Sequence, residues 1–155
     1  IAGQLGKQPP LILACCGGGG LTAGLALACP QATIAPVEPL GWDMVARGLA
    51  AGSPQRVGPD APATICDALR PDATGQIVID TLDRERTRPL TVDDEEVRAA
   101  QRFAFAKLGL VAEPGGAAAL AAALAGKLAL EDDTVIMLTG RNVDPAAYAA
   151  TIDPS

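Results

Sequence analysis

The residues best placed to do chemistry are four consecutive glycines at positions 17–20. They follow the apolar run 11–15, which has the pattern of a buried strand, and precede residues 21–28, which have the pattern of a helix. At such a turn the first N–H groups of the helix have no partner, and the helix dipole adds positive charge. Because side chains would keep a phosphate away from these groups, the glycines favour an anion-binding loop over a flexible linker.

Two anionic ligands fit this pattern. Residues 18–23 match the dinucleotide motif G-x-G-x-x-A, and Glu38 ends the next predicted strand at the spacing expected for ribose binding. Pyridoxal phosphate is the other candidate, because a single phosphate needs a compact cluster of amides. Four glycines offer more free amides than a dinucleotide turn requires. The glycines alone leave both ligands open.

The elements expected to position the glycines alternate between strands and helices. Asp93 and Glu96 have the spacing of a capping box. The proline-rich middle is the least regular part, and we expect residues 84–88 to form a solvated connection. We expect strands at residues 11–15, 32–37 and 134–138, and helices at 21–28, 42–51, 76–82, 93–107, 116–125 and from 145 onward. This order predicts a three-layer α/β fold with a mostly parallel sheet.

Composition excludes several functional classes. The net charge of −6 argues against nucleic acid and anionic membranes as partners, and no apolar run is long enough to span a bilayer. Histidine is absent, which excludes histidine metal sites and Ser-His-Asp or Cys-His catalysis. The four cysteines contain no C-x-x-C pair, so we expect buried, reduced thiols. A cytoplasmic protein that acts on a small molecule is the expectation.

Six short motifs occur in one order along the chain. They are CGGGGL at 16–21, VEP at 37–39, TICDAL at 64–69, VDDEE at 92–96, EPGGA at 113–117 and TGRNVDP at 139–145. Together they resemble the landmarks of fold-type-II pyridoxal-phosphate enzymes of the threonine dehydratase and serine racemase group. The dinucleotide interpretation explains only the first two motifs and becomes the alternative. The resemblance implies that residues 1–155 form one cofactor-phosphate-binding domain, the carboxyl-terminal part of a longer enzyme.

The resemblance also implies roles for individual residues. Thr139 takes the place of a serine or threonine whose hydroxyl faces the pyridine nitrogen. Glu113 lies close to the cofactor ring, although a charge favoured at a helix N-terminus explains it equally well. Backbone amides would hold the cofactor phosphate, and they belong to Gly17, Gly18, Gly19, Gly20 and Leu21.

A divalent cation, Mg or Ca, is a further implication of the resemblance. Glu38 resembles a glutamate that binds such an ion beside the phosphate loop. A hard cation needs several oxygen ligands. The second carboxylate would be expected at Met44, whereas the nearest acid is Asp43, one position earlier.

Other positions depart from the family pattern. Ala68 and Arg141 stand where the family usually has glycine. The lysine that the family links to the cofactor, the opposite-face serine and the substrate-carboxylate loop are expected upstream of Ile1. The lysines of this chain, Lys7, Lys107 and Lys127, match none of them. We therefore expect no catalysis by this chain alone and a missing amino-terminal half as its partner.

For the longer enzyme, the resemblance implies β-elimination on L-threonine or L-serine, which gives a 2-oxo acid and ammonia. Serine racemisation is the alternative within the family. A nicotinamide-dependent oxidoreductase domain and a non-catalytic fragment are alternatives of other classes. The expected ligand is a small amino acid, and the expected assembly is a homo-oligomer.

Overall fold

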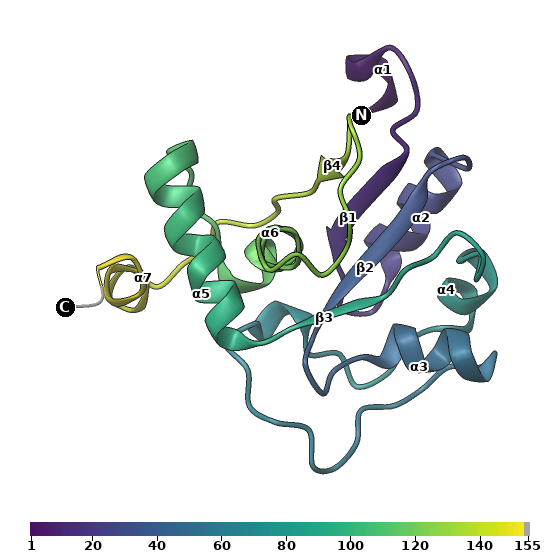
Figure 1. The fold of residues 1–155 in the computed structure, drawn as a ribbon. Coiled ribbons are helices and arrows are strands. Elements are labelled where there is room, and N and C mark those ends of the chain that lie inside the picture. Colours follow the sequence, from purple (N-terminus) through teal and green to yellow (C-terminus); the bar gives the residue numbers. More distant parts are fainter. Residues whose placement is uncertain (154–155) are drawn as a thin grey trace.

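Within residues 1–153, the part of the chain described by the computed structural model, four strands form one sheet. The strands are β1 (Leu11–Cys15), β2 (Thr33–Pro39), β3 (Leu90–Val92) and β4 (Val135–Ile136), and their spatial order is β3-β2-β1-β4 (Figure 1). All three neighbouring pairs are parallel. The carboxyl ends of the strands therefore meet at one edge of the sheet.

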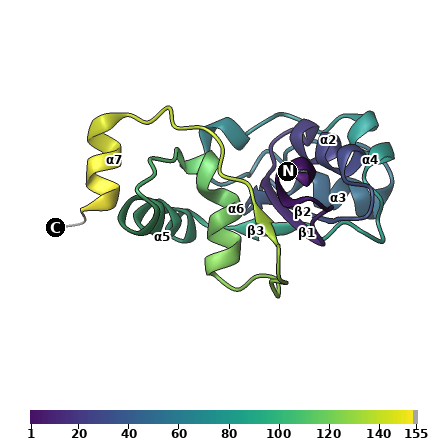
Figure 2. The ribbon, with the colours of Figure 1, turned by 90° about the horizontal axis from the view of Figure 1, so that it is seen from above.

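Helices cover both faces of this sheet. Helix α6 crosses β1, β2 and β3 on one face and packs against α5, whereas α2 lies on the other face with α4 and α3 (Figures 1 and 2). The helices are α1 (Ala2–Leu5), α2 (Gly20–Ala28), α3 (Met44–Ala51), α4 (Gln76–Thr81), α5 (Asp94–Phe103), α6 (Pro114–Leu124) and α7 (Pro145–Ile152). A 3-10 turn spans Asp67–Leu69, and a π-helical turn, Ala104–Leu108, extends α5. The three-layer α/β prediction is confirmed.

Strand β1 is buried along its whole length, as its apolar run predicts. Leu11 and Leu13 face the core on the α6 side, whereas Ile12 and Ala14 face the α2 side. This alternation follows from the two-residue period of a strand, and a strand with helices on both faces needs apolar side chains in both directions. Its neighbour α6 consists almost entirely of glycine, alanine and leucine, so the helix can approach the sheet closely.

The amino end of α5 has the capping box that the sequence predicts. Asp93 Oδ1 accepts hydrogen bonds from the amides of Glu95 and Glu96, at 3.0 and 2.9 Å. Glu96 Oε2 accepts one from the Asp93 amide at 2.9 Å. These bonds satisfy N–H groups that the helix leaves without partners and fix the start of α5 directly after β3.

The prediction for residues 84–88 is wrong in part. The Ile34 amide donates to the Arg86 carbonyl, and the Arg88 amide donates to the Ile34 carbonyl, both at 2.8 Å. Thr87 is buried between two exposed arginines, and the chain continues into β3, which the sequence analysis did not predict. The free edge of β2 provides the hydrogen-bond partners, and the arginine side chains still reach solvent.

Several predicted boundaries shift by one or two residues, and two elements differ more. The predicted strand 134–138 pairs only over Val135–Ile136, and the predicted helix 93–107 changes to π-helical geometry after Phe103. None of the helices within residues 1–153 combines the length and the apolar character needed to cross a bilayer.

Candidate functional site

The glycine loop, residues 17–20, lies at the carboxyl edge of the sheet between β1 and α2. The Cys16 amide donates to the Val37 carbonyl at 2.8 Å, so β1 stays paired up to the first glycine. The Gly19 carbonyl accepts from Ala23 N and Thr22 Oγ1, which closes the first turn of α2. The amides of the four glycines and of Leu21 donate to no acceptor in the described part of the chain. Free donors thus gather at the N-terminus of a helix, where negative charge is favoured.

Packing explains some of these glycines and leaves others unexplained. Gly19 has φ 88°, and a Cβ there would overlap Val78 Cγ1. Gly17 lies against the 66–71 segment, where a Cβ would be 3.4 Å from the Ala68 carbonyl oxygen. At Gly18 and Gly20 a Cβ would meet no atom within 4 Å. The fold does not require glycine at these two exposed positions, whereas a ligand that approaches the amides would.

Thr139 lies at the same edge of the sheet, next to the last residue of β1. Strand β4 pairs with β1, and the Met137 amide donates to the Leu13 carbonyl at 2.9 Å. The chain then brings Thr139 Oγ1 to 3.0 Å from Cys15 Sγ. Burial raises the pKa of the Cys15 thiol, so the thiol stays protonated near neutral pH. Nothing in the sequence spacing indicated this contact, because the two residues are 124 positions apart.

Glu113 joins the start of α6 to the loop that follows β4. It is the residue before the first turn of α6. Its amide donates a hydrogen bond to the Gly140 carbonyl at 3.2 Å, and its Oε2 accepts one from the Asn142 amide at 2.9 Å. Gly140 has φ 58°, and a Cβ there would overlap the Glu113 carboxylate. The carboxylate therefore fixes the backbone of residues 139–142, on which Thr139 lies.

The segment 64–69 fills the space between the glycine loop and α6. Asp94 Oδ1 accepts hydrogen bonds from Thr64 Oγ1 at 2.7 Å and from the Ile65 amide at 3.1 Å. The sequence analysis gave Asp94 no role. Its position within the VDDEE motif was visible, but its partners lie 29 and 30 residues away along the chain. Ala68, where the family usually has glycine, is exposed next to Gly17.

Glu38 has a different environment from that expected for a cation ligand. Its side chain is fully buried, and its two oxygens accept hydrogen bonds from the amides of Val45 and Ala46, at 2.8 and 3.1 Å. Burial raises the pKa of Glu38 to about 7, against the lowering effect of the two amides. Asp43, the acid considered as a second cation ligand, instead forms an ion pair with Arg47, at 3.6 Å. Within residues 1–153 no three His, Cys, Asp or Glu side chains are grouped to hold a metal ion. Asp43, the N-cap residue of α3, makes no capping hydrogen bond, and Glu38 accepts those of the first turn in its place.

The lysines lie away from the glycine loop. Lys7 Nζ is 2.6 Å from Asp133, in the segments that precede β1 and β4, and so at the opposite edge of the sheet. Lys127 pairs with Glu96 at 2.6 Å, directly after α6, and Lys107 is exposed in the π-helical turn.

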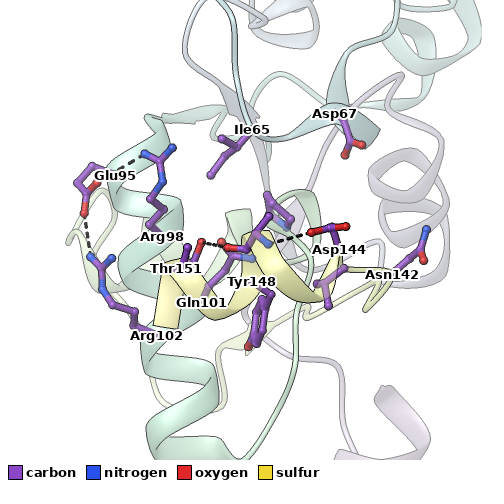
Figure 3. A pocket seen from close by; sticks show the side chains of 14 residues that line it. Ile65, Asp67, Glu95, Arg98, Gln101, Arg102, Asn142, Asp144, Tyr148 and Thr151 are labelled. Carbon is purple, nitrogen blue, oxygen red and sulfur yellow. Dashed lines mark hydrogen bonds and ion pairs between the residues drawn. The ribbon is translucent and has the colours of Figure 1, made fainter. Parts of the chain in front are cut away.

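A cavity lies between α5 and α7 and also reaches Asp67, Pro114 and Asn142 (Figure 3). Its volume is about 610 Å³, and neither the glycine loop nor Thr139 lines it. Gln101 and Tyr148 are buried in its walls, and Gln101 Oε1 and the Tyr148 hydroxyl have no hydrogen-bond partner within the described residues. The charged groups of its α5 wall, Glu95, Arg98 and Arg102, pair with one another.

Comparisons with known proteins decide between the two cofactors that the glycine loop left open. Residues 1–140 match the family model described as pyridoxal-phosphate dependent enzyme. Over 139 residues the chain is 37% identical to phenylserine dehydratase of Ralstonia pickettii, covering 86% of this chain and 42% of that protein. It is 33% identical to serine racemase of Schizosaccharomyces pombe, covering 89% and 44%.

Solved structures give the same relationship. The crystal structure of threonine deaminase from T.th. superposes with a TM-score of 0.79 at 36% identity, covering 92% of this chain and 52% of that one. Maize serine racemase superposes with a TM-score of 0.79 at 30% identity, covering 97% and 48%. The chain thus spans about half the length of these relatives. Its cofactor is pyridoxal phosphate, and the chain belongs to the fold-type-II family of pyridoxal-phosphate-dependent enzymes that includes dehydratases and racemases.

Proposed function

We propose that the protein to which this chain contributes removes water from a β-hydroxy amino acid, L-threonine or L-serine, and releases a 2-oxo acid and ammonia. In this reaction the Cα proton and the β-hydroxyl leave as water. Hydrolysis of the resulting imine then consumes one water and frees ammonia. The chain would supply the phosphate-binding loop and the pyridine-nitrogen partner, and an amino-terminal half would supply the lysine.

The observation that carries this proposal is the free amides of the glycine loop. Two of its four glycines, Gly18 and Gly20, have no packing reason to be glycine, because a Cβ at either position would meet no atom within 4 Å. A phosphate needs several N–H donors and room for its oxygens, and the unpaired amides of this loop support that role. These residues fit the cofactor phosphate, and Leu21 adds a fifth amide.

Thr139 would act on the other end of the cofactor. Bound pyridoxal phosphate withdraws electrons from the Cα of the amino acid. A neutral hydroxyl can hydrogen-bond to the pyridine nitrogen without adding the negative charge that would favour its protonation. The ring then withdraws electrons less strongly, which suits β-elimination better than transamination.

Racemisation of serine is the second candidate, because serine racemases are among the relatives at about one third identity. Both reactions begin with loss of the Cα proton. The chain contains none of the acid or base groups expected on the two faces of Cα, so its own residues do not favour one outcome.

One assay separates these functions. The intact protein, which includes the amino-terminal half, is incubated with pyridoxal phosphate and either L-threonine or L-serine. We expect 2-oxobutyrate or pyruvate to form, whereas predominant D-serine would indicate a racemase. Absence of both products, together with no visible absorbance from bound cofactor, would reject the proposal.

The chain alone should be inactive in the same assay. Turnover on the order of 1 per second by residues 1–155 would mean that Lys7, Lys107 or Lys127 binds the cofactor. Addition of the amino-terminal half should restore activity if the two pieces associate, because each supplies groups that the other lacks.

A further inference from the structure

We infer that Cys15 is a positioning residue, which donates a hydrogen bond to Thr139 and so directs the threonine hydroxyl at the cofactor nitrogen. This inference rests on the proposed function, because it assigns the cofactor nitrogen as the partner of Thr139. It concerns a thiol that the sequence analysis described only as buried and reduced.

The first support is geometric. Cys15 Sγ lies 3.0 Å from Thr139 Oγ1, and it is the hydroxyl's only hydrogen-bond partner within the described residues. Hydrogen bonds of the backbone hold both residues in place. Cys15 ends β1, and the Thr139 amide donates to the Gly116 carbonyl at 3.3 Å. Neither group therefore needs to move for the contact to persist.

The second support is the balance of donors and acceptors. A threonine hydroxyl has one proton to donate and can accept from other donors. If that proton goes to a pyridine nitrogen, the oxygen can accept the thiol proton, which gives the chain S–H to O–H to N. Hydrogen bonds in such a chain polarise one another and strengthen the last one. Without the thiol, the hydroxyl can rotate among several orientations.

The third support is the protonation state of the thiol. Cys15 is 8% exposed, and its surroundings are the apolar core that contains Leu13, Val37 and Leu69. A thiolate is costly in such surroundings, so the sulfur keeps its proton. Every member of the chain is then neutral, in keeping with a cofactor ring that is not forced into its protonated form.

The experiment is a double-mutant cycle in the intact holoenzyme. Cys15→Ala removes the donor, Thr139→Val removes the acceptor with little change in shape, and the double variant combines them. Cys29→Ala is the matched control, because Cys29 is an equally buried thiol in the core on the other face of the sheet. The measurements are the absorbance maximum of the bound cofactor, the cofactor dissociation constant, kcat and KM.

We expect Cys15→Ala to lower kcat about fivefold, the loss of one neutral hydrogen bond, with KM changed less than twofold. The cofactor absorbance maximum should shift in the same direction as in Thr139→Val. In the Thr139→Val background, Cys15→Ala should have no further effect on kcat or on absorbance. Cys15→Ser, which keeps a donor, should stay within about twofold of the unmodified enzyme.

Two results would overturn the inference while the proposed function stands: an equal effect of Cys15→Ala in both backgrounds, or behaviour indistinguishable from Cys29→Ala. If Cys15→Ala fails to fold, Cys15→Val fills the site without a donor and takes its place in the cycle. An unmodified enzyme that shows no absorbance from bound cofactor would instead reject the proposed function, and the inference with it.

Discussion

At the carboxyl edge of the sheet, glycines such as Gly17 and Gly116 let backbone segments pack closely against one another, whereas between α5 and α7 longer side chains surround a cavity of about 610 Å³. The first region includes the glycine loop, Thr139 and the start of α6. Its polar side chains, Glu113 and Thr139 among them, have partners. In the second region two buried polar atoms, on Gln101 and Tyr148, have none within residues 1–153 (Figure 3).

The two regions therefore differ in how firmly they hold their polar groups in place. Backbone contact and satisfied hydrogen bonds hold the edge of the sheet to one geometry, which a site needs if it is to direct atoms. The α5–α7 cavity also has paired groups along α5, but its buried Gln101 Oε1 and Tyr148 hydroxyl have no partner in the described residues, so its donors and acceptors are only partly fixed. The volume of a cavity is therefore a weaker argument for a site than polar groups whose hydrogen bonds fix their positions.

The largest effect is expected from a carboxylate in the glycine loop. Gly20→Asp should weaken pyridoxal phosphate binding by the intact enzyme about a thousandfold, because two charges about 4 Å apart repel by about 4 kcal/mol. Folding should be unharmed or improved, since an acidic residue is favoured in the first turn of α2. Cofactor titration and thermal unfolding measure the two effects separately.

Gly24→Asp is the matched control. Gly24 lies one turn later in α2, and its Cβ would also meet nothing within 4 Å. Loss of cofactor binding in both variants would point to a disturbed helix instead of a phosphate site. Gly19→Asp would be less informative, because Gly19 has a positive φ and a Cβ there would overlap Val78, so the substitution would also destabilise the fold.

A smaller effect tests the backbone contact between α6 and the loop after β4. Gly116→Ala should lower the free energy of unfolding by about 3 kcal/mol, because its Cβ would overlap the Thr139 carbonyl oxygen. Gly115→Ala, whose Cβ would be 3.2 Å from Leu69 Cγ and would overlap no backbone atom, should cost about 1 kcal/mol. Chemical denaturation measures both, and equal costs would contradict the close approach of α6.

Glu38 should make stability depend on pH. Its pKa is raised to about 7 in the folded chain, so its protonated form is favoured there relative to the unfolded chain. This contribution is complete below pH 4.5 and is lost as pH rises to about 7, so the free energy of unfolding should fall by roughly 3 kcal/mol across that window. Glu38→Gln should flatten this slope. An unchanged slope in that variant would assign the pH dependence to other groups.

The smallest effect is expected in the cavity. Tyr148→Phe should leave stability unchanged or raise it by up to about 1 kcal/mol, because it removes a buried hydroxyl that has no partner in the described part of the chain. The edge-to-face contact with Phe105, at 6.2 Å, would remain. A loss larger than about 1 kcal/mol would reveal a partner for the hydroxyl in solution.

The features predicted from the sequence are those with a local signal. The strand 11–15 followed by glycines is visible because a continuous apolar run and a glycine cluster both act within a few residues. The capping box at Asp93 is equally local. Strand β3 escaped prediction because it has three residues after Pro89 and an arginine-rich segment, and the edge of β2 decides its conformation.

Contacts between distant segments had no such signal. The capping of α3 by Glu38 depends on the turn after β2, which brings the carboxylate under a helix N-terminus. The Cys15–Thr139 contact depends on β4 lying beside β1. For Glu38 and for Cys15, the residue type is compatible with several roles, and only the position in the tertiary structure determines which contacts the side chain makes.

The pairing of β4 with β1 also makes this edge of the sheet depend on segments that lie far apart along the chain. Residues 12 and 135 are register partners, so the edge of the sheet closes across most of the chain. Each doubling of the number of residues in such a loop adds only about 0.6 kcal/mol to the entropic cost of closing it. Long-range parallel pairing is nevertheless slow to form. During synthesis β1 and β2 can pair as soon as both have left the ribosome, whereas Thr139 follows Cys15 by 124 residues. A chain interrupted before β4 would therefore contain the glycine loop and Cys15 without the Thr139 hydroxyl that contacts the thiol.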